Sequence, residues 1–278
     1  MNIPSDVRLY DLAPSPNCIK ARIGLNLKAV PFRKIAVDPK DRAAVVKSSG
    51  QPLTPVLLYG PAVVFDSHAI LRWLDANVRQ GPRLFSADYA TMKKIEEWEV
   101  FARSGLERSV RQMFGMAFGR IPVTDEAVAA ANVAFAADSA RLEEALTKGP
   151  WLVGGEVSAA DVMLAANFYY ASQPEHPTVR ALPFWSVFQR FDLGPGRDRT
   201  RDWLARTMAW DCWLNDAARS VASSKAVKSS SSSRSSSRSS SKPSRRSSSK
   251  KSAARKPARK PAKRKSAPRS KAAKRSRR

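Results

Sequence analysis

Cysteine and histidine are scarce in this sequence, which contains two of each. They are Cys18, Cys212, His68 and His176, and long stretches of chain separate them. Two distant cysteines do not indicate a disulfide framework, and the four residues lack the close spacing of a zinc site. We therefore expect no metal site and no disulfide, and a reducing, cytoplasmic compartment.

Long apolar runs are also missing. No segment reaches about 18 uninterrupted apolar residues, the length that a helix needs to cross a bilayer. The first residues, MNIPSDVRLYDL, lack the basic region and the apolar stretch of a secretory signal. We expect neither a membrane span nor a membrane partner.

Acidic and aromatic residues are absent from the last part of the chain. Residues 222–278 hold 22 Lys and Arg but no Asp or Glu, whereas residues 1–221 hold 27 basic and 24 acidic residues. The net charge of +25 therefore belongs almost wholly to this tail. The tail has no large apolar side chain beyond Val227, so it cannot bury enough surface to offset the entropy lost on ordering, and we predict that it is disordered.

The tail changes from Ser/Arg repeats to runs rich in Ala, Pro and Lys. The second part resembles the terminal tails of linker-histone-like proteins. Such a polycation binds phosphate backbones by releasing counterions, and without aromatic side chains it cannot stack on bases. We expect non-specific binding to nucleic acid or another polyanion, which leaves a nucleoid or nuclear location open. A solubilising tail and a targeting signal, as in the basic run 263–265, are the alternatives.

The first part of the chain has the pattern of a β-α-β unit. Strand-type residues at 7–12 and 32–37 flank an apolar helical repeat at 17–28. The strands of such a unit are normally parallel. A short helix at 41–47 follows.

Two short apolar strands come next, at 56–59 and 63–65, with a Gly-Pro turn between them. Asp66 and Ser67 then open an amphipathic helix that runs to Val78. The free N–H groups at a helix start attract carboxylates, so this segment is the first functional indication.

Residues 81–86 form a linker that closes an α/β domain of residues 1–80. Strand signals vanish after it, and we predict an all-helical domain over residues 87–221. Ser158 and Asp161 have the spacing of a capping box. The expected helices lie at 90–119, 124–146, 158–171, 178–191 and 199–218.

Four segments together resemble the cytosolic glutathione transferases. They are SPNCIKARIGL at 15–25, Thr54-Pro55-Val56, FDSHAILRWL at 65–74 and WLVGGEVSAAD at 151–161. They occur in order and at suitable spacing, and the resemblance spans residues 7 to about 215. It implies a thioredoxin-like α/β domain followed by an all-α helical bundle, a homodimer, and glutathione as co-substrate.

The resemblance implies roles for the residues around the hairpin. Ser67 and the N–H groups beside it would hold the γ-glutamyl carboxylate of glutathione, with Asp66 near the ammonium. The backbone of Val56, next to a cis Thr54–Pro55 bond, would pair with the cysteinyl part like an added strand. The loop before Thr54 is longer than is usual in the family, so Gln51 is our choice for the glycyl carboxylate.

The glutathione thiol must become a thiolate before it can attack. By resemblance, the Ser15 hydroxyl at the start of the first helix would stabilise the thiolate, with Asn17 as a second donor. The alternative is that Cys18 is itself a nucleophile, as in a glutathione-dependent thiol transferase. A further alternative is that Ser15 only caps the helix. Tyr10 lies one position from the place of a catalytic tyrosine, and we interpret it as structural.

A small hydrophobic electrophile would bind between the loop at 13–16 and the first long helix. His68 could approach the ligand, but we interpret it as a solvated helix residue. We interpret Trp203, Trp210 and Trp213 as packing residues. The candidate pocket residues are Phe101, Arg108, Met113 and Phe114.

The leading hypothesis is therefore a glutathione transferase-like enzyme with a polycationic tail. The rival is a non-catalytic module of the same fold that dimerises or docks, again with a tail that binds nucleic acid. The sequence does not identify the electrophile.

Overall fold

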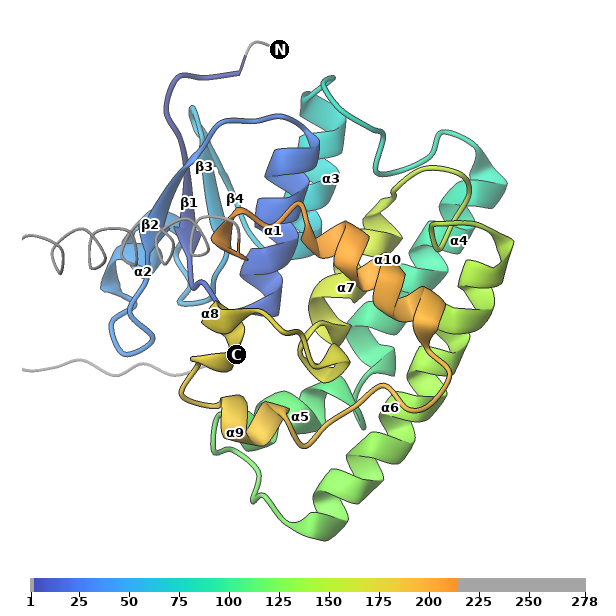
Figure 1. Cartoon of the computed structure of the whole chain (residues 1–278). Helices are drawn as coiled ribbons and strands as arrows, with labels where there is room; N and C mark the ends of the chain where they lie inside the picture. Colours follow the sequence, from blue (N-terminus) through green and yellow to red (C-terminus); the bar gives the residue numbers. More distant parts are fainter. Residues whose placement is uncertain (1–2, 215–278) are drawn as a thin grey trace, which may run out of the picture. The chain divides into compact units, whose positions relative to one another are not determined.

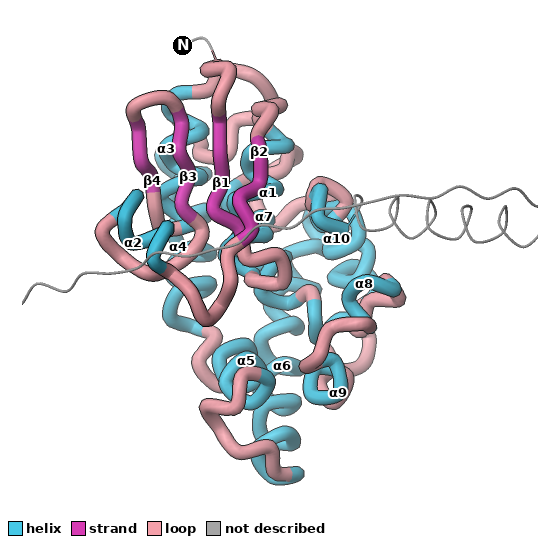
Figure 2. Tube along the Cα trace, turned by 90° about the vertical axis from the view of Figure 1, so that its left-hand side faces the viewer, coloured by secondary structure: helices cyan, strands magenta, loops and turns pink. Residues whose placement is uncertain are grey.

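The N-terminal part of the protein is built on one mixed four-stranded sheet. A computed structural model describes residues 3–214. The tail, for which we predict disorder and polyanion binding, and the end of the last expected helix lie outside these residues. The strands are β1 (Val7–Asp11), β2 (Arg33–Ala36), β3 (Val56–Tyr59) and β4 (Ala62–Val64). They lie in the order β2-β1-β3-β4, with β1 parallel to β2 and the other pairs antiparallel (Figure 2).

Alternation along the strands decides which helix covers which face of the sheet. Leu9 and Leu57 are cross-strand partners and share a buried cluster with residues of α1 (Pro16–Leu27) and α3 (Ser67–Asn77). The next pair along, Tyr10 and Val56, packs instead with Val45 of α2 (Ala43–Ser49). The β-α-β pattern predicts the α/β domain, and its layering is the thioredoxin-like arrangement that the family resemblance implies.

The second part of the described chain is helical. Its elements are α4 (Tyr89–Val100), a π-helix (Phe101–Gly105), α5 (Val110–Ala117), α6 (Asp125–Ala145), α7 (Ala159–Phe168), α8 (Pro177–Arg180), α9 (Trp185–Phe188) and α10 (Asp198–Met208), with short 3-10 turns at Leu146–Lys148 and Tyr170–Ser172. All ten residues of α7 are buried. This helix contacts α4, α10 and α1 of the first domain (Figure 1), so it is the centre of the helical core.

Helix α1 is buried on two sides for this reason. Ala21 and Leu25 belong to the core beneath the sheet, whereas Ile19 and Ile23 belong to the large core of the helical domain. The start of α1 is therefore held between the two domains.

The prediction of one long helix at 90–119 is wrong. The α-helix ends at Val100, a π-helix follows over Phe101–Gly105, and α-helical structure begins again only at Val110. A side chain at Gly105 would lie 2.3 Å from the Phe101 ring, and Ser109 leaves the helical region with φ −101° and ψ −86°. The Ser109 hydroxyl donates a hydrogen bond to Asp138 of α6 at 2.6 Å, so a tertiary contact holds the break open.

The expected helix at 178–191 is also interrupted, into α8 and α9. Pro183 lies between them, and proline lacks the N–H that a continuing helix needs while disfavouring helical geometry at the residue before it. Of the three tryptophans interpreted as packing residues, Trp203 is fully buried, Trp213 is partly buried and packed on the core, and Trp210 is 44% exposed, which corrects the interpretation for that residue.

The capping box at the start of α7 is confirmed and has a wider role. The Asp161 carboxylate accepts hydrogen bonds from the Ser158 N–H at 2.8 Å, from the Leu152 N–H at 2.9 Å and from the Trp203 indole at 2.8 Å. Burial raises the pKa of Asp161, although these donors act in the opposite direction. One carboxylate thus joins α7, the bend before it and α10.

A buried ion network ties the segment after α10 to α1. Arg22 is fully buried and bonds Asp211 through Nε at 2.6 Å and through Nη2 at 3.0 Å, and its Nη1 pairs with Asp11. Its Nη2 also donates to the Ala13 carbonyl at 2.9 Å.

Within residues 3–214, no helix is both long and apolar enough to cross a membrane.

Candidate functional site

A cleft of about 640 Å³ lies where the start of α1, the loop before β3 and the start of α3 face the π-helix and α5. The sequence-predicted site residues that line it are Asn17, Gln51, Thr54, Pro55, Asp66, Ser67 and Phe114. Those that do not are Ser15, Cys18, Val56, Phe101, Arg108 and Met113.

Asp66 is the N-cap of α3. Its side chain accepts hydrogen bonds from the N–H groups of His68 at 2.8 Å and Ala69 at 3.0 Å, which satisfies two of the donors that a helix start leaves free. Burial alone would raise the pKa of Asp66, but the Ala69 N–H and the Arg103 guanidinium outweigh it, so the pKa is lowered. Asp66 is therefore ionised at neutral pH.

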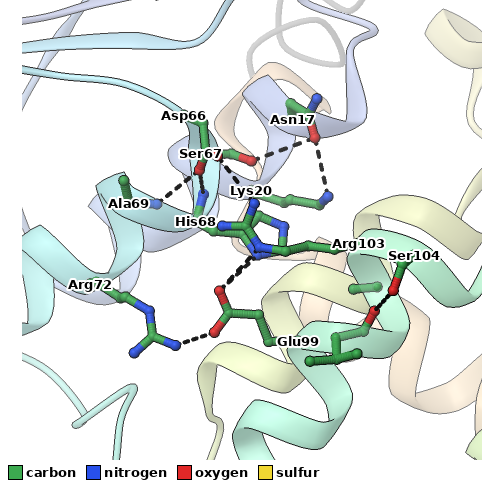
Figure 3. A network of polar contacts seen from close by, with 12 residues as sticks. Asn17, Lys20, Asp66, Ser67, His68, Ala69, Arg72, Glu99, Arg103 and Ser104 are labelled. Carbon is green, nitrogen blue, oxygen red and sulfur yellow. Dashed lines mark hydrogen bonds and ion pairs between the residues drawn. The ribbon is translucent and has the colours of Figure 1, made fainter.

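Ser67 begins α3 and is buried, with 3% of its surface exposed. Its hydroxyl donates to the side-chain oxygen of Asn17 at 3.5 Å, and Lys20 donates to the same oxygen at 3.1 Å (Figure 3). Asn17 and Lys20 lie one turn apart on α1, so both point to the same side. A hydroxyl, an amide and an ammonium group are thus brought together at one end of the cleft.

The sequence interpretation missed Lys20. Its side chain lines the cleft although only 3% of the residue is exposed. Burial, reinforced by the charge of Arg103, lowers the pKa of Lys20 to about 8. The available signal was a lysine within a helix whose neighbours Ile19, Ala21 and Ile23 are all apolar.

At this end of the cleft, charged residues of the helical domain pair with charged residues of α3 and its cap. Glu99 of α4 pairs with Arg72, with Arg103 Nε at 3.3 Å and with His68 Nδ1 at 3.3 Å (Figure 3). Burial would raise the pKa of Glu99, but the His68 hydrogen bond and the charge of Arg72 lower it to about 2. Arg103 Nη1 also lies 3.2 Å from Asp66 Oδ2.

The interpretation of His68 as a solvated residue is wrong. It is 5% exposed, lines the cleft and contacts Glu99. Burial lowers the pKa of His68, although the hydrogen bond with Glu99 acts in the opposite direction. The helical domain covers what would be an exposed helix face in the first domain alone, and the sequence pattern of α3 does not reveal that cover.

The loop before β3 forms the other wall of the cleft. The Thr54–Pro55 bond is cis, as expected. Gln51 stabilises the loop itself, because its amide donates to the Leu53 carbonyl at 3.0 Å and its oxygen accepts from the Leu53 N–H at 2.6 Å. Val56 begins β3 and pairs with Tyr10 of β1, whereas the β3–β4 pairing begins only at Leu57, so β4 does not reach Val56. Its side chain is fully buried, so Val56 could offer a ligand only its backbone.

Ser15 is the N-cap residue of α1 but does not cap it. Its hydroxyl makes no capping hydrogen bond, and its N–H donates to the Leu12 carbonyl at 2.8 Å in a tight turn. The Tyr170 hydroxyl donates to the Pro14 carbonyl at 2.7 Å and fixes the same turn. These contacts fix the backbone turn that carries Ser15 beside a helix start, and the missing capping bond argues against a purely capping role.

Cys18 lies in the first turn of α1 and is fully buried. Its sulfur accepts a hydrogen bond from the Leu12 N–H at 3.3 Å. Burial and the charge of Asp11 raise the pKa of the Cys18 thiol to about 11. A thiol with so little thiolate at neutral pH is a poor nucleophile.

Only one of the four residues proposed for an electrophile pocket lines the cleft, and it is Phe114 of α5. Phe101 and Met113 belong to the helical core instead, where an arginine, Arg141, stacks over the Phe101 ring at 4.1 Å. Arg108 is exposed in the segment between the π-helix and α5. The expectation assumed one continuous helix over these residues, and the structure contains the π-helix and a break before Val110 instead.

Two family models match the chain. The model described as "Glutathione S-transferase, N-terminal domain" matches residues 9–82, and that described as "Glutathione S-transferase, C-terminal domain" matches residues 125–206. Together they cover more than half of the chain.

Solved structures share the fold. Poplar glutathione transferase F1 matches with a TM-score of 0.60 and 20% identity, over 76% of this chain and 98% of that one. The theta class glutathione S-transferase of Xanthomonas axonopodis pv. citri, whose structure has glutathione bound, matches with a TM-score of 0.52 and 24% identity, over 68% of this chain and 97% of that one.

A curated relative is Elongation factor 1-gamma 2 of Oryza sativa subsp. japonica, 26% identical over 115 residues. The match covers 41% of this chain and 27% of that protein, so the chain spans about a quarter of the length of this relative.

Proposed function

Because the chain belongs to the glutathione S-transferase family, we propose that its cleft binds glutathione and that the protein promotes attack of the glutathione thiol on a small hydrophobic electrophile. Members of this family use glutathione as co-substrate. The observation that carries the proposal is the convergence of Asn17, Thr54-Pro55 and Asp66-Ser67, from three separate segments, on one cleft.

Ser15 is our candidate for the group that stabilises the thiolate. An unperturbed thiol has a pKa of about 8.5, and lowering it by about one to two units requires roughly 1.4–2.8 kcal/mol of preferential interaction with the thiolate. A hydrogen bond from a hydroxyl to a charged acceptor, beside the positive end of α1, is of this size. Asn17, in the first turn of the same helix, would be a second donor.

The proposed step is a nucleophilic substitution or addition. The thiol proton passes to solvent and the sulfur forms a bond to the electrophilic carbon. In a substitution, the leaving group departs with the electron pair of the broken bond. In an addition, the π bond of the electrophile breaks, its electron pair moves to the far atom, and that atom takes a proton from solvent. Phe114 and Val110, on the α5 side of the cleft, offer apolar surface to the electrophile.

The test is the Ser15→Ala variant with chlorodinitrobenzene as a probe electrophile. We expect kcat/KM to fall about 10- to 100-fold and the pKa of bound glutathione, followed by thiolate absorbance, to rise by about one to two units. Ser104→Ala, an exposed serine on the π-helix, is the matched control. Full activity in Ser15→Ala contradicts the assignment of Ser15.

A non-catalytic role of the same site is the second candidate. The observation that favours it is that Ser15 is not among the residues that line the cleft. Glutathione binding without turnover of any probe electrophile would support it. We also propose the homodimer that the resemblance implies, and sedimentation equilibrium of the full chain tests it.

We further propose that residues 222–278 bind nucleic acid or another polyanion. This rests on the 22 basic and no acidic residues of the tail. Affinity for duplex DNA should fall steeply with salt, because each neutralised phosphate releases a counterion. Affinity that hardly changes between low and moderate salt, or that survives removal of residues 222–278, contradicts the proposal.

A further inference from the structure

The charged residues around the cleft leave one cation without a carboxylate partner. Glu99 pairs with Arg72 and Arg103, and Arg103 also pairs with Asp66. Lys20 lies in the same group but contacts neither carboxylate within hydrogen-bonding distance in the described part of the chain (Figure 3). With three cations against two carboxylates, this end of the cleft has an excess positive charge.

The Lys20 ammonium group is buried and has few hydrogen-bond partners, which is unusual for a cation. The residue is 3% exposed, and among residues 3–214 its ammonium group has a single hydrogen-bond acceptor, the Asn17 side-chain oxygen at 3.1 Å. An ammonium group has three N–H donors, and a buried cation is costly unless it is paired. Two donors therefore remain for a ligand in the cleft that Lys20 lines.

We propose that Lys20 is the counter-ion for the α-carboxylate of the γ-glutamyl group of glutathione. The proposal rests on the proposed function and adds a charged side chain of α1 to the contacts expected from Ser67. Lys20 Nζ and Ser67 Oγ both donate to the Asn17 oxygen, so their donors converge on one point, and a ligand carboxylate that replaces the Asn17 oxygen as acceptor receives both. A charge-assisted hydrogen bond of this kind is about twice as strong as a neutral one.

The glutamyl end of glutathione fits this end of the cleft better than the glycyl end. An α-amino acid group carries a carboxylate and an ammonium on one carbon, and Lys20 and Asp66 provide the two opposite charges near each other; the charge of Asp66 acts on Lys20. The glycyl end carries a carboxylate alone. Gln51 and Leu53, in the loop before β3, line another part of the same cleft.

The experiment measures binding of two peptides to the full-length chain by calorimetry. One is glutathione, and the other is 4-aminobutanoyl-Cys-Gly, which lacks only the α-carboxylate. The variants are Lys20→Gln and Lys20→Met, and Lys93→Gln, an exposed lysine on α4, controls for the loss of one positive charge. Thermal unfolding of each variant confirms that it is folded.

We expect both Lys20 variants to bind glutathione about tenfold more weakly or worse, and the wild type to bind the truncated peptide with a similar loss. The truncated peptide should bind the wild type and the variants equally, and Lys93→Gln should match the wild type. A Lys20 variant that binds glutathione as the wild type does, or that weakens both peptides equally, overturns the inference alone. A wild type that binds no glutathione overturns the proposed function and the inference with it.

Discussion

Arg103 Nη1 lies 3.2 Å from Asp66 Oδ2, so an ion pair joins the π-helix of the second domain to the residue that caps α3. The other oxygen of Asp66 is engaged by two N–H groups of α3. Both carboxylate oxygens are therefore in use within the protein itself. A ligand ammonium that approaches Asp66 has to compete with Arg103.

Replacing Arg103 with Gln should therefore strengthen glutathione binding. The pair is half-exposed, with side-chain exposures of 45% and 57%, and such pairs contribute less than about 1 kcal/mol, so we expect a gain of about two- to fivefold. The comparison ligand is glutaryl-Cys-Gly, which lacks the ammonium and should show no gain. Equal gains for the two ligands, or a loss for glutathione, would show that Arg103 does not compete for Asp66.

Replacing Cys18 with Ala should leave catalysis nearly intact. The thiol is fully buried and its pKa is about 11, so at pH 7 only about one molecule in 10⁴ carries a thiolate. We expect kcat/KM to stay within about twofold and the free energy of unfolding to fall by roughly 1 kcal/mol, since a small buried group is removed. Loss of activity in Cys18→Ala with full activity in Ser15→Ala would favour the cysteine-type mechanism instead.

Replacing Lys20 with Met should stabilise the fold at neutral pH. Its pKa is lowered from 10.5 to about 8, so between these values the unfolded chain binds more protons than the native one. Stability of the wild type then rises as pH increases from about 8 to 10.5, and the charged Lys20 is a cost below that range. Burial is the main cause of this lowered pKa, with Arg103 acting in the same direction and Asp66 in the opposite one. Asn17, which accepts from Lys20, and His68 also face this group.

Urea unfolding at pH 7 and near pH 10 measures this difference. We expect the free energy of unfolding of Lys20→Met to exceed that of the wild type by roughly 1–3 kcal/mol at pH 7, and this difference to shrink at the higher pH. Lys93→Gln should lie within about 0.5 kcal/mol of the wild type. A Lys20→Met protein that is less stable at pH 7 would show that the fold depends on this cation.

Most of the fold could be predicted because its signals are local. The β-α-β pattern, the hairpin and the Ser158–Asp161 capping box each depend on residues close together in sequence, and the structure contains all three. The break after the π-helix could not be predicted, because it depends on the Ser109–Asp138 contact between distant segments.

The site residues also divide into those with a local sequence signal and those that depend on contacts between distant segments. Asp66 and Ser67 could be found because a cap has a sequence signature. Lys20, Arg103 and the burial of His68 could not, because they become important only when the helical domain packs against α3. A charged residue in an apolar repeat is a clue to such a site, but the repeat does not show which partner covers it.

Replacing Asp161 with Asn should weaken the whole helical core. The carboxylate accepts from Leu152, Ser158 and Trp203, and an amide would turn an N–H₂ toward at least one of these donors. We expect a loss of about 2–4 kcal/mol in the free energy of unfolding. Asp202→Asn, an exposed aspartate on α10, is the control and should change stability by less than about 0.5 kcal/mol. A similarly small effect of Asp161→Asn would contradict the role given to this carboxylate.

The most direct test of the account is calorimetric titration of the full-length chain with glutathione. We predict saturable binding of one glutathione per chain, weakened about fivefold or more by Ser67→Ala and unchanged by Ser186→Ala, an exposed serine on α9. Absence of saturable binding to the wild type, or binding that Ser67→Ala leaves untouched, would contradict the assignment of this cleft to glutathione.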